Sequence, residues 1–123
     1  MATVGTMVIC CDNSGAFMCK CIKVLGNRVQ PGHARVGDGI VVSVQKARLG
    51  KKIKKHDVLR GILVRSTSRI VRRNGMVYRS KENAVVILNK KGVPACTRIF
   101  GAVGHELRYR RCTKILSMAP CII

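Results

Sequence analysis

Apolar residues occur in short runs along roughly the first hundred positions, and each run ends at residues that favour turns. A run from 6 to 11 is followed by Asp12-Asn13-Ser14-Gly15, and strand-like character resumes from 16 to 25. Because Asp, Asn, Ser and Gly favour turns, through side-chain bonds or a free φ angle, we predict a β-hairpin there. Residues 27–39 carry further Gly and Pro residues and are predicted to form a loop.

Three later segments are also predicted to be strands: 40–44, 58–65 and 83–88. Residues 40–44 are almost all apolar and β-branched, which indicates a strand that is buried on both faces or closed into a barrel. Several short strands with regular turns and no long helix are typical of a small closed barrel. The sequence therefore predicts a mainly β fold.

Two tight turns are predicted next to these later strands. Asn74-Gly75 lies at the centre of the segment 70–79, and this pair is the strongest short-range sign of a hairpin. It favours a type I′ turn, in which both residues have positive φ. A second hairpin turn is predicted at 89–92, directly after an apolar strand.

The strand pattern ends after residue 104. Glu106 and Leu107 begin a stretch without strand alternation. Thr113 is placed to cap a following helical turn with its hydroxyl, and Pro120 ends that turn. We therefore predict two short C-terminal helices.

The length of 123 residues suits one domain over 1–123. Within it, we expect the β-barrel to occupy about 1–103 and the short helical segment about 104–123.

The charge balance points to a polyanionic partner. The chain holds 24 Lys and Arg against 5 Asp and Glu, so its formal net charge is +19, while 47% of its residues are hydrophobic and can form a core. A folded domain with such an excess repels itself, and nucleic acid relieves that repulsion. A histone-like or other free-standing architectural binder, or a nucleic-acid chaperone, fits the charge as well as a ribonucleoprotein component does.

The basic residues gather in three clusters, at 46–55, 60–79 and 108–114, and the first contains no acid. Trp is absent and Phe and Tyr number two each, so contacts to backbone phosphate are expected to outweigh base stacking. Arginine also offers a planar fork that binds phosphate through two bonds. The candidate phosphate-binding residues are Lys20, Lys23, Lys46, Arg48, Lys51, Lys52, Lys54, Lys55, Arg65, Arg69, Arg72, Arg73, Arg79, Arg108, Arg110 and Arg111.

Catalytic, metal and cofactor sites are not predicted. The five acids are scattered and form no local pair suited to acid–base catalysis. The seven cysteines lack the spacing of a zinc site and are expected to be free thiols in a reducing compartment. No apolar run approaches the roughly 20 residues needed to span a bilayer.

Motifs along essentially the whole chain resemble one family. Asp12-Asn13-Ser14-Gly15-Ala16, Gly61-Ile62-Leu63-Val64-Arg65, the Asn74-Gly75 pair, Thr97-Arg98-Ile99-Phe100-Gly101 and the run from Lys114 to Pro120 follow one another at a characteristic spacing. Together they resemble the universal large-subunit ribosomal protein number fourteen, in its bacterial and organellar form. One departure is Ser80, where that family usually has Phe or Tyr; our hypothesis is that Tyr78 takes the aromatic's place.

The resemblance implies a five-stranded β-barrel with a projecting β-ribbon and a short helical C-terminal segment. It implies binding to large-subunit rRNA, so the candidate phosphate-binding residues become candidate rRNA-binding residues. It also implies a bridge to small-subunit rRNA, contact with large-subunit protein nineteen and other neighbouring large-subunit proteins, and docking of a ribosome-silencing factor. The residues that match the docking face are Thr97, Arg98 and Lys114. The cysteine content and the charge favour a mitochondrial matrix over a bacterial cytoplasm.

Overall fold

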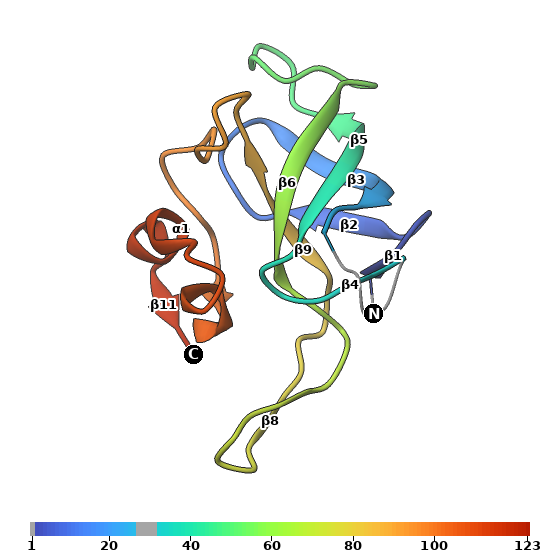
Figure 1. The fold of residues 1–123 in the computed structure, drawn as a ribbon. Helices are drawn as coiled ribbons and strands as arrows, with labels where there is room; N and C mark the ends of the chain where they lie inside the picture. Colours follow the sequence, from blue (N-terminus) through green and yellow to red (C-terminus); the bar gives the residue numbers. More distant parts are fainter. Residues whose placement is uncertain (1, 27–31) are drawn as a thin grey trace.

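A closed five-stranded barrel forms the centre of the computed structural model, which describes residues 2–26 and 32–123 (Figure 1). Its strands are β2 (Met7–Cys10), β3 (Ala16–Val24), β5 (Gly39–Ala47), β6 (Val58–Arg65) and β9 (Ala84–Leu88). They pair in the order β2-β3-β5-β6-β9, and the parallel pairing of β2 with β9 closes the ring. The predicted mainly β fold with a small barrel is confirmed.

The burial pattern of β5 explains why the chain closes into a barrel. Ile40, Val42 and Val44 are fully buried, whereas the residues between them stay partly exposed. The strand therefore has one face towards the barrel interior, and closure, not burial on both faces, accounts for its apolar sequence. β6 and β9 approach closely at Gly61, where an added Cβ would lie 2.5 Å from Cγ2 of Val85.

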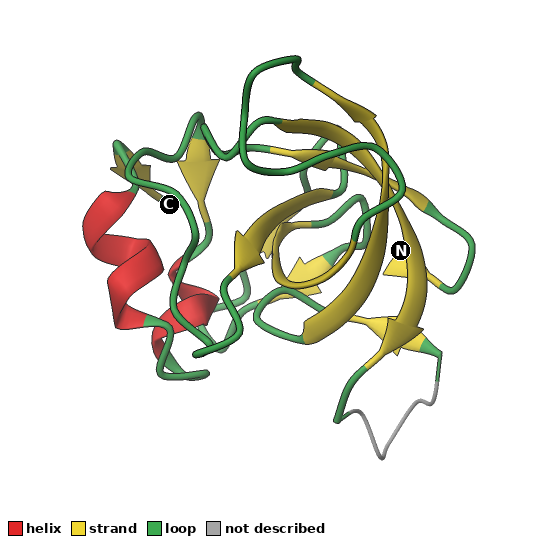
Figure 2. Ribbon diagram, turned by 90° about the horizontal axis from the view of Figure 1, so that it is seen from above, coloured by secondary structure: helices red, strands yellow, loops and turns green. Residues whose placement is uncertain are grey.

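A second apolar core joins the barrel to the C-terminal segment, which lies beside it in Figures 1 and 2. Val64 and Val86 of the barrel are in the same buried cluster as Ile99, Leu107 and Ile115. The segment contains β10 (Ala102–Val103), the 3₁₀ helix η1 (His105–Arg108), α1 (Thr113–Met118) and β11 (Cys121–Ile122). The two short helices are thereby confirmed.

The predicted capping role of Thr113 is wrong. Cys112 occupies the N-cap position of α1, no side chain caps the helix, and Thr113 is its first helical residue. The helix is held by its buried residues Ile115 and Leu116, so packing replaces the missing cap.

A two-stranded ribbon, β7 (Ile70–Val71) and β8 (Val77–Tyr78), projects from the barrel (Figure 1). The hairpin is confirmed, but its predicted I′ geometry is wrong. Of the two central turn residues, Asn74 and Gly75, only Gly75 has positive φ, at 81°. The Gly75 N–H donates to the Arg72 carbonyl at 3.0 Å, and the Arg72 N–H donates to the Met76 carbonyl at 2.9 Å. This is a three-residue loop with glycine in the left-handed position.

The predicted turn at 89–92 is present with the same bonding pattern as the ribbon turn.

Two short strands were not predicted: β1 (Ala2–Thr3) pairs with β4 (His33–Ala34). Part of the predicted loop, 27–31, lies outside the described residues. Within the described ranges, no helix has the length and apolar content needed to cross a membrane.

Candidate nucleic-acid interface

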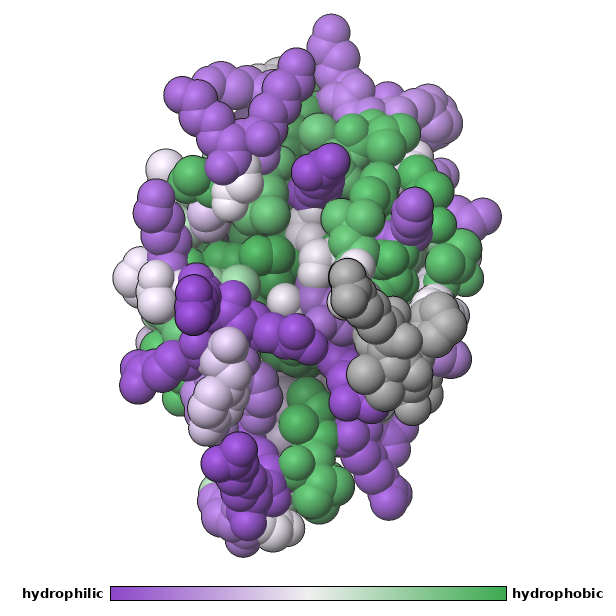
Figure 3. Space-filling view, in the orientation of Figure 1, coloured by the Kyte–Doolittle hydropathy of each residue, from purple (hydrophilic) through white to green (hydrophobic). Residues whose placement is uncertain are grey.

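The loop between β5 and β6, residues 48–57, presents the densest cationic surface. It lies at the opposite end of the barrel from the ribbon, and hydrophilic side chains gather over it in Figure 3. Its four lysines (Lys51, Lys52, Lys54 and Lys55) are exposed, as are Arg48 at its start and Lys46 at the end of β5. Asp57 is used inside the loop, where its Oδ2 accepts the Lys54 N–H at 2.8 Å. Among the described residues, none of the four lysines forms a salt bridge.

The predicted cations of the ribbon region divide into two groups. Arg69, Arg73 and Arg79 are exposed. Arg72 is largely buried, with a side chain 14% exposed, and its Nε donates to Glu106 Oε1 at 2.7 Å. Arg72 also lies over the ring of Tyr78, 5.5 Å from its centroid, so it ties the ribbon to the C-terminal segment.

Arg65 lies inside the molecule, and both terminal nitrogens of its guanidinium are hydrogen-bonded. Nη1 donates to the carbonyls of Phe100 and Ala102 at 3.0 and 3.1 Å. Nη2 donates to Glu82 Oε1 at 2.9 Å, and the side chain of Arg65 is 11% exposed. The sequence analysis grouped Arg65 with the candidate phosphate-binding arginines. In the structure its side chain instead connects the end of β6 to the 100–102 segment by hydrogen bonds.

The remaining predicted cations lie on the surface. Lys20 and Lys23 are exposed on β3, and Arg108 and Arg111 are exposed in the C-terminal segment. Arg110 is half-exposed and pairs with buried Asp38, with Nη2 2.9 Å from Oδ1. Arg110 therefore holds the 35–38 turn as well as contributing positive charge.

The Thr97-Arg98 segment is fixed by a residue that the sequence assigned only to a turn. Asn13 Nδ2 donates to Thr97 Oγ1 at 2.8 Å, and Asn13 Oδ1 accepts the N–H of Thr97 at 3.1 Å and of Arg98 at 3.3 Å. Arg98 in turn lies over Phe100, with Cζ 5.5 Å from the ring centroid. The sequence placed Asn13 in a turn and in a family motif, but not beside the predicted docking face, because its partners there lie more than eighty positions away.

Lys114, the third residue of the predicted docking face, is exposed in the first turn of α1. The segment that carries Thr97 and the helix that carries Lys114 share one core, because Ile99 and Ile115 belong to the same buried cluster. Both elements therefore flank the same part of the molecule.

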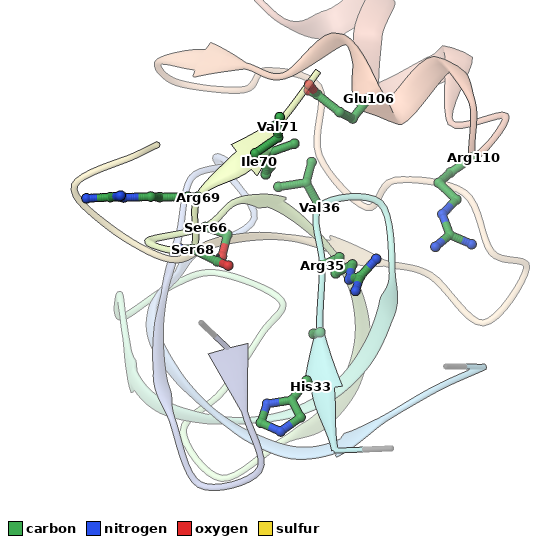
Figure 4. Close-up of a pocket in the computed structure, with 11 residues that line it drawn as sticks. His33, Arg35, Val36, Ser66, Ser68, Arg69, Ile70, Val71, Glu106 and Arg110 are labelled. Atoms are coloured by element: carbon green, nitrogen blue, oxygen red, sulfur yellow. Dashed lines mark hydrogen bonds between the residues drawn. The ribbon is translucent and has the colours of Figure 1, made fainter. Parts of the chain in front are cut away.

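A cavity of about 460 Å³ opens between the 33–36, 66–71 and 106–110 segments (Figure 4). Arg35, Arg69 and Arg110 line it together with apolar Val36 and Ile70. Among the described lining residues the single acid is Glu106, which already pairs with Arg72. The charged side chains at this cavity are therefore mainly positive.

The thiols are arranged as core residues. Burial raises the pKa of Cys11 to about 12 and the pKa values of Cys19 and Cys96 to about 11. Burial also raises the pKa of Cys10, and the carboxyl group of Asp12 adds to the shift. Among residues 2–26 and 32–123, no three potential ligands are grouped to hold a metal ion.

Comparison with known proteins agrees with the resemblance found in the sequence motifs. A family model described as ribosomal protein L14p/L23e matches residues 1–123. Large ribosomal subunit protein uL14m of Neurospora crassa is 43% identical over 131 aligned positions, which cover 98% of each chain. The chain therefore belongs to the ribosomal protein L14p/L23e family, and it is a structural protein of the large ribosomal subunit and not an enzyme.

Proposed function

We propose that the chain binds large-subunit rRNA mainly through the exposed cations of the 48–57 loop, β3, the ribbon and the C-terminal segment. The observation that carries this proposal is the loop surface, where four exposed lysines have no acidic partner among the described residues. Each cation that meets a phosphate releases a condensed counterion, so binding is expected to weaken steeply with salt. Arg65 and Arg72 are not part of this surface, because their guanidinium groups bind internal partners.

The second part of the proposal assigns Thr97, Arg98 and Lys114 to a face that meets small-subunit rRNA or a ribosome-silencing factor. Support comes from the family resemblance and from the way Asn13 holds the Thr97-Arg98 backbone at the surface. Thr97, Arg98 and Lys114 are all exposed. A positioned arginine on a surface is better suited to a specific contact than a mobile one, because less side-chain entropy is lost on binding.

The third part concerns neighbouring proteins, of which large-subunit protein nineteen is the chief one implied by the resemblance. The ribbon exposes Val71, Met76 and Val77, at 72%, 57% and 57%. Phosphate contacts make no use of apolar side chains, so we assign these three to a protein neighbour in the assembled subunit.

The mitochondrial ribosome is the setting supported by the relative uL14m of Neurospora crassa, whose name carries the mitochondrial suffix. The free thiols of this chain agree with a reducing matrix.

Reconstitution with large subunits depleted of this protein tests the proposal. We expect the chain to cosediment with the depleted subunits at moderate salt and to restore their joining with small subunits. Arg98→Ala is expected to cosediment normally and to impair subunit joining or silencing-factor docking. An equal loss of cosedimentation would assign Arg98 to rRNA of its own subunit. If the wild-type chain does not cosediment with the depleted large subunits, the alternative of a free-standing nucleic-acid chaperone would be favoured.

A further inference from the structure

Both phenylalanines of the chain lie half-exposed at the same small cavity. Phe17 on β3 is 47% exposed and Phe100 is 50% exposed. Both line a cavity of about 130 Å³ beside the 12–16 turn. Exposed aromatic faces offer a flat apolar surface that a planar partner covers efficiently.

Each of these rings carries an arginine. Cζ of Arg48 lies 4.5 Å from the ring centroid of Phe17, and Cζ of Arg98 lies 5.5 Å from that of Phe100. A guanidinium that lies on a ring keeps its N–H donors in its own plane, where they can bind phosphate oxygens. The two pairs therefore combine surfaces for stacking with donors for an anion.

The parts of the cavity are held together by backbone bonds. The Arg48 N–H donates to the Gly15 carbonyl at 2.7 Å, and the Phe100 N–H donates to the Cys11 carbonyl at 2.7 Å. The side chain of Lys51 passes directly over Gly15, where an added Cβ would lie 2.5 Å from Cβ of Lys51. The backbone that carries the rings and cations is thus positioned before any partner arrives.

The charge at the cavity favours an anion. Its one acidic lining residue, among those described, is Asp12, which is 6% exposed. Asp12 Oδ2 accepts the Ile87 N–H at 2.9 Å, and Oδ1 accepts the Ser14 N–H and the Cys10 thiol at 3.0 Å each. Both oxygens of this carboxylate therefore already accept hydrogen bonds from the protein itself. The exposed charged residues that line the cavity, Arg48 and Lys51, are both positive.

We propose that the surface around this cavity, which we call the Phe17–Phe100 cavity, binds one unstacked nucleotide of ribosomal RNA. The base stacks on the Phe17–Arg48 pair, while the phosphate meets Lys51 and the edge of the Arg48 guanidinium. The proposal rests on the proposed RNA-binding function and adds a base contact to a surface made otherwise of phosphate contacts. Stacking of one base on an aromatic side chain strengthens binding by about 5- to 140-fold.

The test compares two short single-stranded RNAs with the full chain: an oligoadenylate, and the same backbone with abasic residues. The phosphates are identical, so the affinity ratio reports base stacking alone. We expect the wild type to prefer the oligoadenylate by at least about 5-fold. Phe17→Leu, which keeps apolar volume and touches no phosphate, is expected to bring the ratio close to one without weakening binding of the abasic RNA. Arg48→Lys keeps the charge but loses the planar guanidinium, so it is expected to lower the ratio and also to weaken binding of the abasic RNA.

Tyr109→Leu is the matched control, since Tyr109 is 76% exposed and does not line the cavity. Its ratio is expected to equal that of the wild type, and thermal melts check that each variant is folded. Equal binding of both RNAs by the wild type would overturn the nucleotide site and leave the phosphate contacts standing. Binding of neither RNA would instead overturn the proposed RNA-binding function.

A photocrosslinking arm identifies the source of the nucleotide. Phe17→benzoylphenylalanine is incorporated into ribosomes, and crosslinked RNA is sequenced from isolated large subunits and from joined ribosomes. A crosslink in isolated subunits identifies large-subunit rRNA, and one that forms only after joining identifies small-subunit rRNA. A crosslink to protein alone would overturn the proposal.

Discussion

Asn13 holds Thr97 from both ends of its side-chain amide, with Nδ2 donating to Oγ1 at 2.8 Å and Oδ1 accepting the N–H at 3.1 Å. The backbone adds a bond from the Asn13 N–H to the Arg98 carbonyl at 3.3 Å. The turn between β2 and β3 therefore sets the position of the proposed docking face, although the two are far apart in sequence.

Asn13→Ala is expected to impair silencing-factor docking or subunit joining while leaving the salt dependence of rRNA binding unchanged. The substitution removes three side-chain bonds at an exposed site, so its cost in unfolding free energy is expected to be about 1 kcal/mol. Asn74→Ala is the control, because among the described residues the Asn74 side chain hydrogen-bonds only within its own turn, to the Met76 N–H. Docking by Asn13→Ala at wild-type strength would contradict a positioning role.

Arg65→Lys is expected to destabilise the fold by about 2 kcal/mol, because one ammonium cannot reach the two carbonyls and the Glu82 carboxylate together. Urea unfolding measures the loss. The salt slope of RNA binding is expected to stay at its wild-type value. Arg69→Lys, at an exposed position, is the control and is expected to leave stability unchanged. An Arg65→Lys protein as stable as the wild type would contradict the internal role of Arg65.

Arg65 is buried and Arg69 is exposed, although the sequence predicted the same phosphate-binding role for both. The alternation and turn residues predicted most of the barrel, because they reflect local rules of side-chain direction and backbone conformation. They placed β6 at its observed bounds, Val58–Arg65. They could not show that Val64, near the end of β6, packs into the second core, because other members of that core, such as Leu107 and Ile115, lie far along the chain.

The ribbon turn illustrates a second limit. Asn74-Gly75 correctly predicted a hairpin. The turn type, however, depends on which residue pair is the last one that the two strands form before the loop. Here pairing extends to Arg72 and Met76, which leaves three loop residues and requires positive φ only at Gly75. Asn13 and the Phe17–Phe100 cavity were missed for the same reason as Arg65, since each depends on contacts between distant segments.

Titration of Glu106 is expected to make the free energy of unfolding depend on pH. Burial alone would raise its pKa, but the hydrogen bond and charge of Arg72 outweigh this effect, and the net pKa is lowered. A folded-state pKa below the unfolded value of about 4.3 stabilises the fold above that pH. This contribution is lost as the pH falls through the folded-state pKa. Glu106→Gln should therefore be less stable than wild type near neutral pH and equally stable in strong acid. A constant difference in unfolding free energy across the range would contradict this assignment.

Alkylation of the native protein is expected to modify Cys121 first and Cys112 more slowly. Cys121 is exposed, whereas Cys112 is half-buried and burial raises its pKa. The other five thiols are buried and are expected to react only after unfolding in guanidinium, because the thiolate is the reactive species. Intact mass measurements count the adducts. More than two rapid adducts on the folded chain would show that the barrel opens, and Cys121→Ser should remove the fastest one.

Alanine at Lys51, Lys52, Lys54 and Lys55 is expected to flatten the salt dependence of rRNA binding. Each lost phosphate contact lowers the slope of log affinity against log salt by roughly 0.7–0.9, so four contacts amount to roughly 2.8–3.6. Arginine at the same four positions keeps the charge and is expected to keep the slope. A slope that is unchanged by alanine would mean that the loop faces water in the assembled subunit. The charge excess of the chain would then have to be neutralised by β3, the ribbon and the C-terminal segment.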